Sequence, residues 1–320
     1  MKATGIRFIV VFIVLTTSVK AQRDTLLSAV DTFHPKRFNS ALASTSVVYL
    51  GSATGLYFMW YKDIPSTSFH FFNDLNEWNQ TDKYGHIYTA YIQSKILTDM
   101  FRWTGIKPMP SAILGSSVAF VTSSTIEVFD GFSQKWGASM SDIGANFIGS
   151  AFYLGQEFVF KKQILKIKYS ITLNTYQDPI LKARSDDLYG TNILQKVVKD
   201  YNGSTHWLCM SSSDIFPHSK CPKYIGIAIG FGSSGMFGGM SNQWTDKKGV
   251  YHDRTDIERY RKFLLSPDID FTKIKTHSKV LKSLFYVLDF TKLPLPTLEY
   301  NTKGEFIFHP FYLMNFRKEF

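Results

Sequence analysis

The chain has 320 residues, of which 36 are basic and 26 acidic, and its formal net charge is +10 at pH 7. The basic residues form no single stripe and accompany no nucleic-acid motif, so their charge argues against nucleic acid as a partner and favours anionic lipid or a solvated surface. A chain of this length forms one large domain or two ordinary ones. Its two cysteines, Cys209 and Cys221, either close a loop in an oxidising compartment or remain free thiols.

Residues 1–21 have the three parts of a Sec signal peptide. Lys2 and Arg7 give a positive start, Phe8–Val19 is apolar apart from three hydroxyl residues, and a small-residue cleavage site precedes Gln22. The alternative is an uncleaved anchor. We predict export to the cell envelope and membrane association on the periplasmic side, with the outer membrane favoured over the inner membrane. No cysteine follows the apolar run to accept a lipid anchor.

Residues 22–160 are predicted to be helical. Leu42–Trp60 is uncharged and long enough to cross a bilayer. Asp82–Trp103 has the pattern of an amphipathic helix, Ser111–Phe132 has a small and apolar middle, and Ser139 can cap a helix that ends near Phe160. Small residues are frequent, as they are where helices pack closely in lipid, although a soluble bundle with a tight core has them too. We predict a membrane-associated bundle of about four helices.

Residues 161–320 are predicted to be rich in β-strands. Ile167–Leu173 and Tyr224–Phe231 alternate with period two, the second with isoleucine on one face and glycine or alanine on the other. Such alternation indicates strands with one buried face. Lys279–Phe290 has the spacing of one amphipathic helix. The predicted fold class is therefore α+β, with a signal peptide, a helical domain and a β-rich domain in that order.

Three short motifs place polar pairs on the otherwise apolar helices. The residues of each pair are three or four positions apart, so they share one helix face. The candidate polar cluster consists of Asp82, Lys83 and His86, then Glu127 and Asp130, then Asp142 and Asn146.

Unpaired charge in an apolar bundle costs several kcal/mol, so these groups are expected to meet each other if the helices pack together. One interpretation is purely structural, a buried network that fixes the helix register. The other is functional: the groups bind a phosphate or amine headgroup, support hydrolysis through a general base, or hold a divalent metal with mixed nitrogen and oxygen ligands. The spacing matches no specific metal, nucleophile, phosphate-loop or dinucleotide signature. We therefore assign no catalytic residue, no metal and no cofactor.

The pattern Asp82-Lys83-x-Gly85-His86, followed by Glu127-x-x-Asp130-Gly131 and Asp142-x-x-Ala145-Asn146-x-x-Gly149, resembles the YfiM-like family. These are uncharacterised bacterial proteins described as predicted periplasmic lipoproteins. The resemblance covers roughly residues 40–160, and the order of polar residues is distantly similar to that of VanZ-like membrane proteins, which are associated with glycopeptide tolerance. It implies an envelope location and the same list of site residues, and it implies no reaction.

Three functions are carried forward. The leading hypothesis is a non-enzymatic envelope protein that binds a membrane lipid or cell-wall amphiphile headgroup at the polar cluster. The second is a membrane-associated hydrolase of a phospho- or acyl-lipid that uses His86 with Asp82, Glu127 or Asp130. The third is a structural outer-membrane subunit whose β-rich half meets an envelope protein partner.

Overall fold

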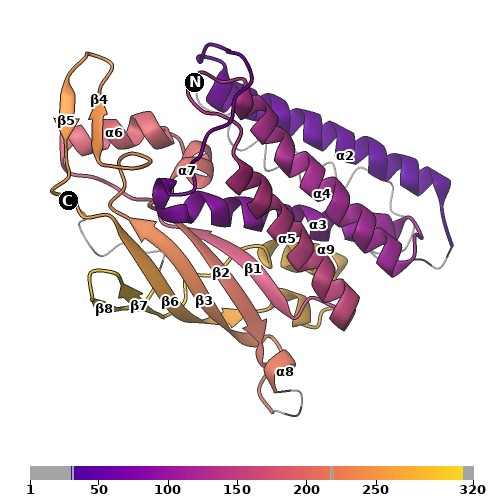
Figure 1. Ribbon diagram of the computed structural model, residues 1–320. Helices are drawn as coiled ribbons and strands as arrows, with labels where there is room; N and C mark the ends of the chain where they lie inside the picture. Colours follow the sequence, from indigo (N-terminus) through magenta and orange to yellow (C-terminus); the bar gives the residue numbers. More distant parts are fainter. Residues whose placement is uncertain (1–29, 31, 217, 219, 313–320) are drawn as a thin grey trace. The chain divides into compact units, whose positions relative to one another are not determined.

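The computed structural model of the protein describes residues 30, 32–216, 218 and 220–312, shown in Figure 1. The predicted signal peptide, residues 1–21, lies outside them. The chain divides into two compact units. The helical unit comprises the described residues up to 73 together with 89–162, and the sheet unit comprises 74–88 and the residues from 163 onward. Helices come first and an antiparallel sheet follows, which confirms the predicted α+β class.

Long helices with recognisable ends build the helical unit. They are α2 (Pro35–Leu56), the short π-helix η1 (Tyr57–Tyr61), most of α3 (Thr81–Trp103), α4 (Pro108–Gly131) and α5 (Met140–Phe160). Proline opens both α2 and α4, where its missing N–H costs nothing. Ser139 caps α5 as predicted, because its Oγ accepts a hydrogen bond of 3.0 Å from the Asp142 N–H.

The helix with the length and apolar composition to cross a membrane is α4, and it is the one such helix in the described part of the chain. The predicted candidate, Leu42–Trp60, is instead divided between α2 and the π-helix η1. The core helix of a soluble protein can pass the same test as α4. Close packing supports α4 on one side, because a Cβ at Gly115 would lie 2.4 Å from Oγ1 of Thr98 on α3.

Six antiparallel strands form the main sheet of the second unit, in the order β1-β2-β3-β6-β7-β8 (Figure 1). Their bounds are β1 Leu165–Ile171, β2 Ser204–Ser211, β3 Ile225–Ser234, β6 Tyr260–Ile269, β7 Thr297–Asn301 and β8 Phe306–His309. A separate hairpin pairs β4 (Gln243–Thr245) with β5 (Tyr251–Asp253), and the helices between strands are α6 (Pro179–Tyr189), α7 (Ile193–Lys199), α8 (Ser212–Ile215) and α9 (Lys279–Leu288). The short 3-10 helices are η2 (Glu77–Gln80) and η3 (Phe271–Lys273).

The buried face of the sheet is not the isoleucine face. In β3, Ala228 is fully buried whereas Ile227 and Ile229 are 42% and 62% exposed. The small residues of β3 make room for Trp207, which is only 1% exposed and packs with Ala228. A Cβ at Gly230 would lie 2.6 Å from the Trp207 ring. Alternation therefore predicted the strands correctly, and in β3 the smaller side chains are the ones that face the core.

Cys209 and Cys221 are not joined in a disulfide. Cys209 is buried in the same core as Trp207, and Cys221 is exposed. Burial raises the pKa of the Cys209 thiol well above its ordinary value, and the neighbouring Asp268 carboxylate adds to this. Cys209 therefore stays protonated and is a poor nucleophile.

Replacing Gly230 by leucine should destabilise the sheet unit, because the new side chain overlaps the Trp207 ring. We expect a loss of roughly 1–3 kcal/mol, the usual cost of overpacking. Ile229→Leu, one position along and facing outward, is the matched control and should melt like the parent. Thermal unfolding in mild detergent measures both, and equal melting temperatures would show that Gly230 is not needed for packing.

Candidate functional site

The first motif lies at the start of α3, in the sheet unit. The Lys83 ammonium is 2.7 Å from the carboxylate of Asp74 and 3.0 Å from that of Asp82. The Tyr201 hydroxyl donates a 2.9 Å hydrogen bond to the other oxygen of Asp82. His86 follows Asp82 by one helical turn. The lysine thus bridges two carboxylates, and Asp82 is held from two sides.

A strained turn fixes where α3 begins. Trp78, Asn79 and Gln80 have φ values of 51°, 50° and 63°, three consecutive non-glycine residues in the left-handed region. Each such residue costs of order 1–3 kcal/mol, so neighbouring contacts must hold it. The Trp78 N–H donates to the Gly239 carbonyl at 2.9 Å, and the side chain of Arg261 donates to the Gln80 amide oxygen. Strain of this kind clusters at functional sites.

Carboxylates crowd around this turn. Burial raises the pKa of Glu77, and the negative charges of Asp74 and Asp82 raise it further, against the opposing effect of Lys83. The Trp78 ring stacks near Tyr201, with centroids 5.2 Å apart. The start of α3 therefore combines a strained backbone, three neighbouring carboxylates and one bridging ammonium.

Sequence reasoning missed a histidine beside this segment. His206 on β2 is buried, and its ring lies among three tyrosines, 6.2 Å from Tyr84, 6.2 Å from Tyr88 and 5.4 Å from Tyr169. Its Nδ1 makes no hydrogen bond to the described residues. Burial lowers the pKa of His206 to about 3, although the Asp82 charge opposes the shift. No motif surrounds His206 in the sequence, so only the pairing of strands reveals it.

The second motif lies at the end of α4, in the helical unit. The Tyr61 hydroxyl donates a 2.7 Å hydrogen bond to Asp130, and the Ser139 N–H donates a 2.9 Å hydrogen bond to Glu127. Burial raises the pKa of the Tyr61 phenol, and the Asp130 and Glu127 charges raise it further. Glu127 is only 2% exposed. Both carboxylates are thus held in fixed orientations.

The third motif begins α5. Asp142 and Asn146 are one turn apart and both buried, following the Ser139 cap. They belong to the helical unit with Glu127 and Asp130, whereas Asp82, Lys83 and His86 belong to the sheet unit. The members of each motif lie on one helix, as expected. A single cluster of all seven residues stays a prediction.

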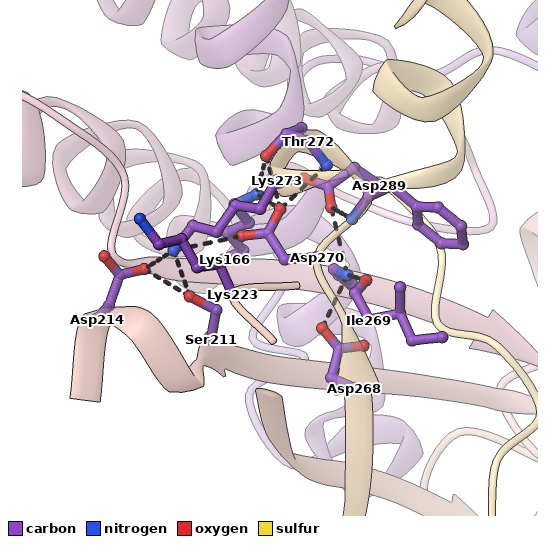
Figure 2. A network of polar contacts seen from close by, with 12 residues as sticks. Lys166, Ser211, Asp214, Lys223, Asp268, Ile269, Asp270, Thr272, Lys273 and Asp289 are labelled. Atoms are coloured by element: carbon purple, nitrogen blue, oxygen red, sulfur yellow. Dashed lines mark hydrogen bonds and ion pairs between the residues drawn. The ribbon is translucent and has the colours of Figure 1, made fainter. Parts of the chain in front are cut away.

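A larger polar network lies under the sheet, and Figure 2 shows it from close by. The Lys166 ammonium of β1 is 2.6 Å from the Asp270 carboxylate and 2.7 Å from that of Asp289. Lys168, two residues on and fully buried, is 2.8 Å from Asp268 and 3.4 Å from Asp289. Asp289 is therefore shared by two lysines.

The network extends through the end of β6 to α8. Lys273 forms an ion pair with Asp214, and its ammonium also donates to Ser211 at the end of β2 (Figure 2). Burial alone would raise the pKa of Asp270, yet Lys166 brings that pKa below its ordinary value. Burial likewise disfavours the charged form of Lys168, and Asp289 with Asp268 outweighs it, so the pKa of Lys168 is raised. For Asp270 and Lys168, the opposite charges of the network therefore offset the cost of burial.

A signal for this network exists in the sequence. Lys166 and Lys168 are two apart in one strand, and Asp268 and Asp270 are two apart at the end of another, so period two places each pair on one face. What the sequence does not supply is the pairing across about a hundred residues that brings these faces together.

The fold and these sites define an α+β protein whose described residues include one candidate membrane helix and a sheet unit with a charged interior. Residues 70–155 match the sequence model of a family described as predicted periplasmic lipoprotein (DUF2279). The matched segment contains all seven predicted site residues. This similarity supports a cell-envelope location on the periplasmic side. No curated protein and no solved structure matches the chain.

Removing Lys168 should leave Asp268 buried without its ion-pair partner and Asp289 with Lys166 alone. We expect Lys168→Met to cost roughly 3–5 kcal/mol of unfolding free energy. Lys168→Met combined with Asp268→Asn should recover part of that loss, because one uncompensated charge is gone. Lys248→Met, at an exposed position in the β4–β5 turn, is the matched control and should melt like the parent. A Lys168→Met variant as stable as the control would contradict the network's role.

The stability of the sheet unit should fall as the pH drops from about 6.5 towards 3. The pKa of His206 is about 3 in the folded chain against an ordinary value of 6.5, so within this window the unfolded chain binds a proton that the folded chain does not. The slope should approach about 1.4 kcal/mol per pH unit. Substituting His206→Phe should flatten it, and His277→Phe, at an exposed position, should not. Thermal melts across this pH range measure the difference, and identical slopes in both variants would refute the assignment.

Proposed function

We propose that the protein is a membrane-attached envelope protein that binds an amphiphile with an ammonium-bearing headgroup at Glu127 and Asp130. The observation that carries the proposal is the position of these carboxylates. They lie in the last two turns of α4, the described helix with the length and composition of a membrane span. The end of a span is where lipid headgroups lie.

Exposed aromatic side chains gather around the same end of α4. The segment after η1 forms backbone hydrogen bonds with the α4–α5 turn: the His70 N–H donates to the Gly131 carbonyl, and the Phe72 N–H donates to the Ala138 carbonyl. The aromatic residues of this region that are 44–63% exposed are Tyr57, Phe58, Phe69, Phe71, Phe72, Phe129 and Phe132. Aromatic belts of this kind mark the membrane–water interface.

The chemistry of this region suits an ammonium group. The Tyr61 ring lies 6.0 Å from Phe129 and 5.7 Å from Trp136 by centroid distance, and its hydroxyl orients Asp130. The Trp136 ring already receives one cation, since the Lys135 Nζ lies 4.9 Å from its centroid. Ring faces and carboxylates together attract ammonium more strongly than either does alone.

A headgroup site is consistent with the resemblance to YfiM-like and VanZ-like proteins. It is also consistent with a preference for the outer membrane and with a cell-wall amphiphile as the ligand. No observation on the described residues supports the hydrolase hypothesis, so we propose binding alone.

Asp130→Asn tests the headgroup site. The amide keeps the size of the side chain and an oxygen that can accept from Tyr61, so the melting temperature should hardly change. The charge that attracts ammonium is lost, so retention of phosphatidylethanolamine should fall several-fold relative to phosphatidylglycerol. Native mass spectrometry of the detergent-extracted protein measures both lipids.

Asp63→Asn is the matched control, because Asp63 is exposed and only two residues from Tyr61. It removes the same charge from the same region and should leave lipid retention unchanged. Equal retention of phosphatidylethanolamine by the parent and Asp130→Asn would overturn the proposed site. If both variants lost phosphatidylethanolamine to the same extent, the effect would come from the overall negative charge of the region, and the proposed site would be overturned.

A further inference from the structure

The buried face of the main sheet carries many polar and charged residues beside its apolar core, and the outward face is apolar. Along β6 the buried positions are Tyr260, Lys262, Leu264, Ser266 and Asp268, and the residues between them point the other way. Lys168 of β1 and Glu299 of β7 are buried on this same face, and the strand register places them in one line across the sheet. A sheet that faces water on one side normally does the opposite, with its apolar face inside.

The strand register aligns the side chains of the outward face into rows across the sheet. One row contains only aliphatic residues until it ends in phenylalanine on the last strand. In strand order it is Ile167, Leu208, Ile229, Leu265, Leu298 and Phe308. Five of the six are 41–62% exposed, and Ile167 is half-buried. A further aliphatic pair, Ile225 and Ile269, lies nearer one end of β3 and β6.

The adjacent row is aromatic on every strand. In strand order it is Tyr169, His206, Phe231, Phe263, Tyr300 and Phe306. Its last three members are 43–83% exposed, whereas Tyr84 at the start of α3 covers His206 and Phe231. Phe231 and Phe263 have ring centroids 6.1 Å apart, and Tyr300 and Phe306 have theirs 4.8 Å apart. The next register pair beyond the aromatic row is Ser233 with Arg261, where the apolar surface stops.

The opposite end of the sheet carries positive charge. β3 begins and β6 ends at the Ile225–Ile269 pair, and the segments that join the sheet there are 215–224 and 270–288. Neither 215–224 nor 271–288 contains an acidic residue. Their exposed lysines are Lys220, Lys223, Lys275, Lys279 and Lys282.

We propose that this face of the sheet lies against the acyl chains of an anionic bilayer, with the exposed aromatic residues Phe263, Tyr300 and Phe306 and the lysine rim at headgroup level on its two sides. An apolar band flanked by aromatic residues is the pattern of strands in contact with lipid. The lysine rim is complementary to anionic headgroups and not to a second copy of itself. The inference rests on the sheet unit and does not depend on the headgroup site.

One face docks on the bilayer, and the sheet does not cross it. β8 has no second neighbour among the described strands, so no described strand pairs with the backbone groups on its outer edge. Hydrocarbon on all sides would leave those groups without hydrogen bonds. A sheet resting on the membrane keeps its edges in the polar headgroup region and places only its outer face in lipid.

A fluorophore on the sheet tests the inference in the full chain. Cys221→Ser removes the exposed thiol, and Cys209 stays unlabelled because it is buried. Leu265→Cys then carries an environment-sensitive label at the centre of the face, and Val250→Cys carries it at a similarly exposed position in the β4–β5 turn, since the two residues are 44% and 52% exposed. The protein is reconstituted into vesicles of phosphatidylethanolamine and phosphatidylglycerol, with or without brominated acyl chains.

Brominated chains should quench the label at position 265 several-fold more strongly than the label at 250. Changing Lys275, Lys279 and Lys282 together to glutamine should reduce that difference. Equal quenching at both positions would overturn the inference. So would a label at 265 that neither brominated lipid nor aqueous iodide reaches, because the face would then be covered by protein, either a second copy or the helical unit.

Discussion

The shared carboxylate of Asp289 is the contact on which the sheet unit depends. It lies within 2.7 Å of Lys166 and 3.4 Å of Lys168, and it reaches them because residues 290–292 pair with the free edge of β1. The Tyr169 N–H donates to the Phe290 carbonyl, and the Lys292 N–H donates to the Tyr169 carbonyl. One backbone pairing thus covers the edge of β1 and delivers the counter-charge that two buried lysines require.

That charged interior determines what the other face of the sheet can be. Residues alternate in a strand, so once Lys168, Asp268 and Glu299 point inward, their apolar neighbours must point outward. Burying ions costs more than burying aliphatic side chains, so the arrangement is unfavourable for a sheet surrounded by water. It becomes favourable when the outward face leaves water, because the exposed aliphatic and aromatic rows then lose their hydration cost.

The sequence predicted the elements better than it predicted their environment. Ser139 and its capping partner fix the start of α5, and alternation identified β3, because both signals are local. Alternation gives a period and not a direction, so the burial of Ala228 in place of Ile229 could not be read from it. His206 depends on β2 lying beside both β1 and the start of α3, contacts that no single-strand pattern contains.

The predicted site illustrates the same limit. Spacing on a helix paired Asp82 with His86, and Lys83 was expected only to neutralise some carboxylate of the cluster; in the structure its ammonium lies 3.0 Å from the Asp82 carboxylate. Spacing did not reveal that Asp74 also forms an ion pair with Lys83, because the strained turn at Trp78, Asn79 and Gln80 lies between them. That turn is held by distant groups such as the Gly239 carbonyl. A turn that costs several kcal/mol persists only where the rest of the unit stabilises it. The start of α3 is therefore fixed by the sheet unit, although most of that helix belongs to the helical unit.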